Sequence, residues 1–348
     1  PRPAQREHAR GAGRRRARGG RMTLAAQAAD IYAPVATGLA ATEVELGQLM
    51  CDVSGVVNDL FQTVNKFGGK RLRPALVHLF GGLVGRPTHE HASLGAIVEA
   101  LHLSSLLHDD VLDGADTRRR LPTLNALHGN EIPILLGDLL YARAFTLSLS
   151  LSTPDASREL AEASVAICRG EIEQSFLRFR PDLDDAAYFR VIGDKTAALY
   201  GASCSLGAIY AGADPRTVEI VRGFGVSLGM AFQIIDDCLD VVGDERLVGK
   251  SLGTDLETGK MTLPTLRLSR RLTGDDKRRF LELLQQPVEG SRREAMRAAF
   301  DFDPIVAECQ VEANGHVEAC LAALEGFADG PERQSLSRLC GFVLSREY

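Results

Sequence analysis

The sequence predicts an all-α protein. Apolar residues recur every three or four positions over long stretches, which is typical of helices that bury one face. The alternation of polar and apolar residues that marks a half-buried strand is rare, and Val, Ile and Thr do not gather in short runs. Because no fixed repeat and no Ser-rich linker divides the chain, we expect one domain of ten or more helices over residues 22–348.

Five stretches carry the clearest helical periodicity: 91–113, 134–151, 158–177, 186–212 and 217–242. Short groups of Gly, Pro and polar residues punctuate the chain between helices: Gly85-Arg86-Pro87, Thr153-Pro154-Asp155, Arg180-Pro181-Asp182, Ala213-Asp214-Pro215 and Thr273-Gly274-Asp275. Proline cannot continue a helix, and Asp or Thr side chains accept the free N–H groups at the start of the next one. These groups therefore predict helix boundaries, and several of the intervening helices are apolar enough to be buried.

The composition is that of a folded soluble protein, with 45% hydrophobic and 25% charged residues in 348. We find no apolar run of the roughly 18 residues that a membrane span needs, so we expect no integral membrane segment. The seven cysteines are dispersed and form no C-x-x-C pair. They predict free thiols in a reducing compartment, and thus a cytoplasmic protein, rather than disulfides or a zinc site.

Residues 1–21 differ from the rest of the chain. They hold eight arginines and one glutamate, are rich in Gly and Ala, and show no apolar periodicity, so we expect this tail to be disordered. Met22 is the first methionine, and we interpret the tail as sequence upstream of the true start; a basic arm that touches nucleic acid or a membrane is the alternative. The remainder is acidic, which argues against nucleic acid as the main partner.

Two acidic motifs of the form D-D-x-x-D end two of the predicted helices: Asp109-Asp110-Val111-Leu112-Asp113 and Asp236-Asp237-Cys238-Leu239-Asp240. On a helix, the first and fifth positions differ by about 40° after a full turn, and the second lies about 100° from the first. All three carboxylates of a motif therefore share one face. The negative charges of the three carboxylates repel one another, and the helix C-terminus adds negative potential.

The repulsion within each motif calls for a bound cation. Oxygen ligands suit Mg²⁺, which uses one or two carboxylates and completes its shell with water and phosphate oxygens. The alternative is a solvated acidic face, which would be a reasonable reading of one motif but is a poor explanation of two at equivalent places.

Basic residues surround both motifs in the sequence. Asp116-Thr117-Arg118-Arg119-Arg120 follows the first, Gly68-Gly69-Lys70-Arg71-Leu72-Arg73 precedes it, and the dipeptides Gly249-Lys250 and Gly259-Lys260 follow the second. Guanidinium groups bind phosphate oxygens in pairs, and glycine lets the backbone approach an anion. Carboxylates, a divalent cation and many basic side chains together predict a site for a phosphorylated substrate.

These motifs resemble those of the trans isoprenyl diphosphate synthases, or polyprenyl synthetases, from about residue 60 to 265. The resemblance extends to Gly170-Glu171-x-x-Gln174, Lys195-Thr196, Phe232-Gln233 and the run Gly253-x-Asp255-Leu256-x-x-Gly259-Lys260. One departure is Arg120, where the family usually has glycine, so the backbone turn there is in question. The resemblance implies an all-α bundle of the isoprenoid synthase type around a deep central cavity, usually in a homodimer.

The family implies addition of isopentenyl diphosphate to an allylic diphosphate, with three Mg²⁺ ions when substrate is bound. Three aspartates are expected to bind Mg²⁺ directly, namely Asp109, Asp113 and Asp236. Three are expected to support them or bind through water, namely Asp110, Asp237 and Asp240. The residues expected to hold isopentenyl diphosphate are Lys70, Arg73, His102 and Arg119, with Arg71 as a further substrate-binding residue. Those expected to hold the allylic diphosphate are Arg118, Lys195, Gln233, Lys250 and Lys260. Thr196 is expected to stabilise developing positive charge.

The residues one helical turn before Asp109 bear on product length. By the family pattern, large side chains at Ser104 and Ser105 would floor the tunnel that receives the growing chain, and two serines leave it open. Leu101 lies deeper on the same face and would set a later stop. We therefore expect a product of C25 or longer. The alternatives are that the serines pack between helices and that a facing helix, such as 131–147, sets the length.

Other functions stay open from the sequence. A short-chain farnesyl or geranylgeranyl diphosphate synthase would share every motif. A class I terpene cyclase shares the fold and the first motif but usually lacks the second, and it needs no isopentenyl site. A non-catalytic partner subunit typically loses aspartates, and all six are present here. A helical scaffold with acidic patches would bind no diphosphate.

Overall fold

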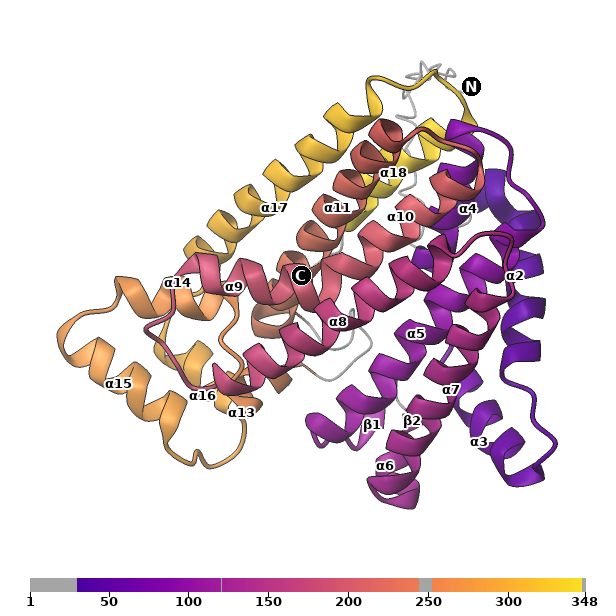
Figure 1. Cartoon of the computed structure of the whole chain (residues 1–348). Coiled ribbons are helices and arrows are strands. Elements are labelled where there is room, and N and C mark those ends of the chain that lie inside the picture. The colour runs from indigo at the N-terminus through magenta and orange to yellow at the C-terminus, as the bar shows by residue number, and fades with distance from the viewer. Residues whose placement is uncertain (1–29, 120, 244–251, 346–348) are drawn as a thin grey trace, which may run out of the picture.

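The computed structural model describes residues 30–119, 121–243 and 252–345, and over these ranges the fold is almost entirely helical (Figure 1). The first half of the chain contains the elements η1 (Ala33–Val35), α2 (Ala36–Leu49), α3 (Gly55–Lys66), α4 (Leu72–Val84), α5 (Glu90–Leu112), α6 (Leu124–His128), α7 (Glu131–Leu149) and α8 (Asp155–Phe176). The second half contains α9 (Asp185–Ile192), η2 (Gly193–Ala197), α10 (Ala198–Tyr210), α11 (Pro215–Val242), α13 (Thr254–Thr258), α14 (Leu263–Arg271), α15 (Gly274–Gln285), α16 (Arg292–Ala299), α17 (Asp303–Leu324) and α18 (Pro331–Leu344). The expectation of an all-α fold is confirmed. The tail 1–21, Arg120 and Lys250 lie outside the described residues.

The predicted helices appear within a few residues of their expected positions. Asp214 begins α11 as predicted, since its carboxylate accepts the N–H groups of Arg216 at 2.9 Å and Thr217 at 3.1 Å. The expected helix 186–212 is interrupted in one respect: between α9 and α10 the element η2 is a π-helical turn. Periodicity does not reveal such a turn, because it displaces the following residues by only one position.

The long helices α5, α7, α8, α10, α11 and α17 run side by side as one bundle, and α13 to α16 gather at one end of it (Figure 1). α10 packs against both α11 and α4, and α5 packs against α2 and α7. The only strands among the described residues are the two-residue segments β1 (Thr117–Arg118) and β2 (Leu121–Pro122), which form a hairpin after α5. Each acidic motif lies in the last turns of its long helix, α5 or α11, so both motifs are presented by the rigid core.

Two helices, α7 and α11, are long and apolar enough to cross a membrane by length and composition alone. Core helices of helical bundles pass the same test. Half of the apolar window of α11 and a third of that of α7 are buried within the fold. α7 therefore presents more apolar surface outside the bundle than α11 does.

Candidate active site

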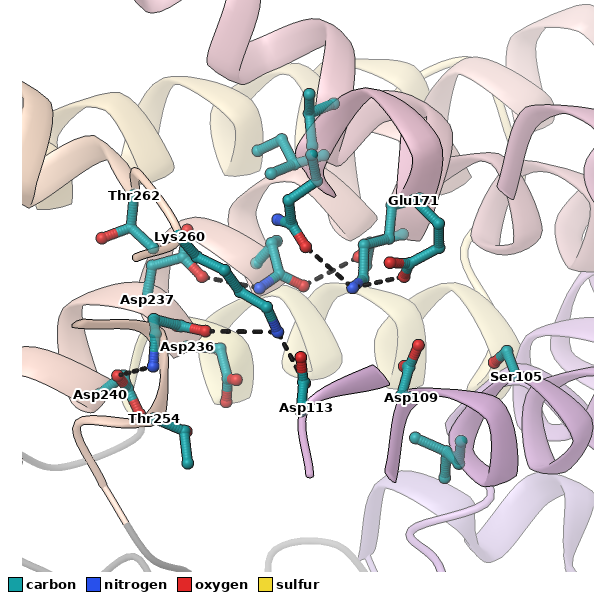
Figure 2. A pocket seen from close by; sticks show the side chains of 18 of the residues that line it. Ser105, Asp109, Asp113, Glu171, Asp236, Asp237, Asp240, Thr254, Lys260 and Thr262 are labelled. Carbon is teal, nitrogen blue, oxygen red and sulfur yellow. Dashed lines mark hydrogen bonds and ion pairs between the residues drawn. The ribbon is translucent and has the colours of Figure 1, made fainter. Parts of the chain in front are cut away.

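A cavity of about 1060 Å³ lies between α5 and α11, and both acidic motifs line it. Figure 2 shows Asp109 and Asp113 on one side and Asp236, Asp237 and Asp240 on the other. Sixteen of the residues singled out in the sequence line this cavity: Lys70, Arg73, His102, Ser105, Asp109, Asp110, Asp113, Arg118, Arg119, Lys195, Thr196, Gln233, Asp236, Asp237, Asp240 and Lys260. The fold thus brings together groups from six separate parts of the chain.

The six aspartates fall into two sets by exposure. Asp109, Asp113 and Asp236 are half-buried, whereas Asp110, Asp237 and Asp240 are no more than 3% exposed. On α5 the buried Asp110 lies about 100° around the helix from Asp109, whereas on α11 Asp240 lies only about 40° from Asp236 and is instead bonded by the backbone of the loop at Gly253 and Asp255. Three of the six lining carboxylates are therefore more accessible from the cavity, and three have almost no exposed surface.

Each embedded aspartate is held by the protein. Arg118 Nε donates to both carboxylate oxygens of Asp110, at 2.9 and 3.1 Å, and Arg118 Nη2 donates to Oδ1 at 2.7 Å. Asp240 accepts the backbone N–H of Gly253 at 3.0 Å and that of Asp255 at 3.2 Å, which fixes the loop before α13. Burial raises the pKa of Asp110, and Arg118 opposes that rise.

Asp237 belongs to a buried chain of hydrogen bonds. It accepts the hydroxyl of Tyr188 and the amide N–H of Gln233, each at 2.7 Å, and the Thr196 hydroxyl donates to Gln233 Oε1 at 2.9 Å. Burial raises the pKa of Asp237 well above its usual range, and the nearby charge of Asp255 adds to this. The chain fixes the orientation of Gln233 and Thr196 at the cavity wall.

Two lysines face the acidic motifs. Lys260 Nζ lies 2.7 Å from Asp113 Oδ2, across the cavity mouth (Figure 2). Lys195 pairs with Glu171 and donates to Gln174 Oε1 at 3.1 Å. Burial alone would lower the pKa of Lys195, but the charges of Asp109 and Glu171 outweigh it and raise that pKa. Both ammonium groups are therefore placed beside carboxylates that a cation could also bind.

The π-helical turn η2 places Lys195 and Thr196 in the cavity wall, as π-turns often do at functional sites. Close packing on both sides holds it there. A β-carbon at Gly170 of α8 would lie 2.6 Å from the Lys195 backbone nitrogen, and one at Gly229 of α11 would lie 2.6 Å from Ala197 Cα. Only glycine at these two positions lets the helices approach η2 so closely.

Basic groups occupy the other end of the cavity. The Arg73 guanidinium lies 4.5 Å from the centre of the Tyr200 ring, and its buried Nε has no hydrogen-bond partner among the described residues. Lys70 Nζ lies 5.4 Å from the Phe342 ring of α18. His102 is kept neutral, because burial and then the charges of Arg73 and Arg118 lower its pKa well below the usual range.

Three residues predicted for the site do not line the cavity. Arg71 forms ion pairs with Glu43 and Glu99 instead. Ser104 is 3% exposed and donates to the Gly137 carbonyl of α7 at 2.8 Å, so it packs between helices, and only Ser105 reaches the cavity. Leu101 is buried in the core at 4% exposure. Ser104 thus follows the alternative in which it packs between helices, and the expected roles of Arg71 in substrate binding and of Leu101 in chain length stay predictions.

Several lining residues were not predicted to act there. The resemblance assigns no role to Glu171 and Gln174, although their spacing on α8 puts both on one face. Asp255, in the run before Lys260, likewise has no role assigned by the resemblance. Tyr188, the partner of Asp237, has no sequence signal, because an isolated tyrosine on an amphipathic helix is read as core.

The carboxylate oxygens at the cavity surface fit a hard divalent cation. Within the described ranges, no group of three or more His, Cys, Asp or Glu side chains is arranged to hold a metal ion. Mg²⁺ does not require such a group, since it binds through one or two carboxylates and takes its remaining ligands from water and phosphate. The donor set therefore suits an ion that is bound together with a phosphorylated ligand.

Comparison with known proteins agrees with this geometry. A family model described as polyprenyl synthetase matches residues 54–301. The chain is 34% identical over 302 residues to the octaprenyl diphosphate synthase of Escherichia coli strain K12, covering 87% of this chain and 93% of that protein. It is 33% identical over 285 residues to a short chain isoprenyl diphosphate synthase of Methanothermobacter thermautotrophicus, covering 81% and 87%. A crystal structure of a polyprenyl synthase from Caulobacter crescentus CB15, complexed with calcium and isoprenyl diphosphate, superposes with a TM-score of 0.87 at 30% identity and covers 92% of this chain and 98% of its own.

Proposed function

Because the chain belongs to the polyprenyl synthetase family, whose members are prenyltransferases, we propose that it joins isopentenyl diphosphate head-to-tail to an allylic diphosphate and makes a polyprenyl diphosphate. The observation that carries the proposal is the single cavity lined by both acidic motifs and by two groups of basic side chains. A terpene cyclase would need only one diphosphate site. A partner subunit or scaffold would have no use for three cavity-facing carboxylates.

We propose that Asp109, Asp113 and Asp236 hold Mg²⁺, since these are the more exposed of the six aspartates that line the cavity. When bound, the metal supplies positive charge that stabilises the departing diphosphate. Lys195 and Lys260 would add fixed charge at the same place, with Lys250 as a further cation by the family pattern. Such preorganised charge is usually the largest contribution to catalysis. The unpartnered Nε of Arg73 supports an anion at the other end, where Lys70, His102 and Arg119 would hold isopentenyl diphosphate.

The residues around the reacting carbons would protect a cationic intermediate. As the C–O bond of the allylic diphosphate breaks, positive charge develops on the allylic carbon, and the oriented Thr196 hydroxyl and Gln233 carbonyl oxygen lie beside this space. Apolar side chains, including Leu106, Ile167 and Phe232, line the same cavity and exclude water. The isopentenyl double bond then attacks the cation, a new C–C bond forms, and a proton leaves to the released diphosphate.

An elongation assay tests the proposal. The protein is incubated with isopentenyl diphosphate, geranyl or farnesyl diphosphate and Mg²⁺, and the products are sized after dephosphorylation. We expect a ladder that ends at C25 or longer, and we expect excess EDTA to abolish it because no diphosphate can then leave. Consumption of the allylic substrate without elongation would instead indicate a cyclase, and no reaction at all would contradict the proposed function.

We propose a homodimer that forms through α7 and α8, which contact each other in the bundle. Large apolar side chains stand exposed on these two helices: Leu135 (55%), Leu149 (65%), Val165 (63%), Ile172 (60%) and Phe176 (83%). Monomers rarely expose so many large apolar side chains on neighbouring helices, and a second copy of the chain would cover these side chains. With free, dispersed thiols, we retain a cytoplasmic location in this proposal.

Light scattering after gel filtration tests the dimer. Val165→Glu combined with Phe176→Glu is expected to yield monomers, because two charges would be buried in the interface without partners. Val311→Glu on α17, also an exposed valine at 71%, is the control and is expected to leave the dimer intact. A dimer that persists in the double variant would assign the interface to another face.

A further inference from the structure

The loop before α4 presents its residues in two directions. Gly69, Lys70 and Arg73 line the cavity, whereas Arg71 between them points away from it. Arg71 has a backbone φ of 49° and a ψ of 35°, the left-handed conformation, which is unfavourable for residues with a β-carbon. Strain of this kind persists only where surrounding contacts impose it, and it concentrates at functional sites.

Two glutamates impose this conformation. Arg71 Nε donates to Glu43 Oε1 of α2 at 2.5 Å, and Arg71 Nη1 donates to Glu99 Oε1 of α5 at 2.8 Å. Glu43 is exposed, but Glu99 is only 3% exposed. An arginine fork bound to two carboxylates on different helices is strongly fixed in orientation. The inner ion pair with the buried Glu99 is the stronger constraint, because solvent does not screen it.

The surrounding backbone is fitted to the Arg71–Glu99 pair. A β-carbon added to Gly69 would lie 3.0 Å from Arg71 Nη1 and 3.2 Å from Glu99 Oε1. Glu99 precedes His102 by three residues, so both lie on the same side of α5. One carboxylate therefore connects the helix that carries His102 to the segment 69–73, in which Lys70 ends the loop and Arg73 lies in the first turn of α4.

We propose that Glu99 is a positioning residue for isopentenyl diphosphate, which acts through Arg71 to hold Lys70 and Arg73 at the cavity opposite His102. This inference rests on the proposed function, because it assumes that this end of the cavity binds isopentenyl diphosphate. It gives Arg71 the role of a link between two helices and a loop. In this proposal, Glu99 supports substrate binding without contacting the substrate.

The variant Glu99→Gln distinguishes a positioning role of Glu99 from a role that only balances the charge of the neighbouring arginines. If Glu99 only offsets the positive charge of the neighbouring arginines, its neutralisation would strengthen the attraction for a diphosphate and lower the KM for isopentenyl diphosphate. If Glu99 positions the loop, the same substitution would raise that KM about tenfold, the lower end of the range for supporting residues around a binding site. The KM for the allylic substrate is expected to stay within about twofold, because Lys195 and Lys260 do not contact this network.

A double-mutant cycle with Arg71→Met tests whether Glu99 acts on the KM for isopentenyl diphosphate through Arg71. We expect Arg71→Met to raise the KM for isopentenyl diphosphate as much as Glu99→Gln does, and we expect the double variant to be no worse than either single one. Glu45→Gln, another glutamate of α2, is the control. Circular dichroism and thermal melting confirm that each variant is folded, and direct calorimetric binding of isopentenyl diphosphate gives the same comparison without turnover.

The outcomes are distinguishable. If the wild type does not elongate an allylic primer, the proposed function fails. If the wild type elongates but folded Glu99→Gln leaves the KM for isopentenyl diphosphate unchanged or lowers it, the positioning role is overturned. Additive effects of the two substitutions would also overturn it, because Glu99 would then act independently of Arg71.

Discussion

Asp109→Asn is expected to lower kcat by roughly a thousandfold with little change in folding. Asp109 lies in the last turn of α5, is half-buried and lines the cavity, and its charge reaches both Lys195 and Glu171. An amide of the same size keeps the packing but cannot offer a charged ligand to Mg²⁺. Loss of one preorganised contact to the developing diphosphate charge costs about 10² to 10³ in rate, and loss of a metal ligand lies at the upper end.

The measurement is the rate at saturating concentrations of both substrates, over a titration of Mg²⁺. Asp138→Asn is the matched control. Asp138 lies on α7, its side chain is 66% exposed, and its Oδ1 lies 3.4 Å from Nε2 of His108. We expect this control to behave as wild type. An Asp109→Asn variant within about threefold of wild type at all Mg²⁺ concentrations would show that Asp109 does not hold the metal.

Ser105→Phe is expected to shorten the product by several isoprene units. Ser105 lies one turn before Asp109 on α5 and lines the cavity, and Figure 2 shows it beyond Asp109, on the side away from the second motif. A phenyl ring there would occupy cavity space beyond Asp109 that, under the proposed function, receives the growing chain. Among the described residues, the serine hydroxyl donates only to the His102 carbonyl of its own helix, at 2.9 Å, so we expect its loss to disturb little else.

Chain length is measured by chromatography of the dephosphorylated products. Ser104→Ala serves as control, because Ser104 bonds the Gly137 carbonyl of α7 outside the cavity and is expected to affect stability by about 1 kcal/mol without changing the ladder. If Ser105→Phe leaves the products unchanged, the stop lies on the opposite wall. Ile167 of α8 lines the cavity there and becomes the position to test.

The fold could be predicted from sequence because helical periodicity is local. The 3.6-residue pattern identified α5, α7, α8 and α11 within a few residues, and Asp214-Pro215 identified the start of α11. The same pattern joined α9 to α10 and missed η2, because a single π-turn leaves the apolar stripe almost continuous. The turn that places Lys195 and Thr196 in the cavity wall was therefore the one that periodicity could not show.

The site could be predicted in composition but not in detail. The two D-D-x-x-D motifs gave six aspartates, but exposure separates Asp109, Asp113 and Asp236 from the others. The motif around Lys70 suggested that every basic residue in it meets substrate, whereas Arg71 turns to Glu99. Ser104 and Ser105 are adjacent in sequence but lie about 100° apart around α5, so only one of them reaches the cavity.

The sequence by itself determined the helices, the two acidic motifs and the basic segments around them, since each depends on residue type and spacing along one element. The tertiary structure alone decided which carboxylates stay accessible, that Tyr188 pairs with Asp237 and Glu99 with Arg71, and which of the two serines lines the cavity. The physical reason is that burial and partnership depend on residues far apart in the chain. Glu99 lies 28 residues from Arg71, and Tyr188 lies 49 residues from Asp237.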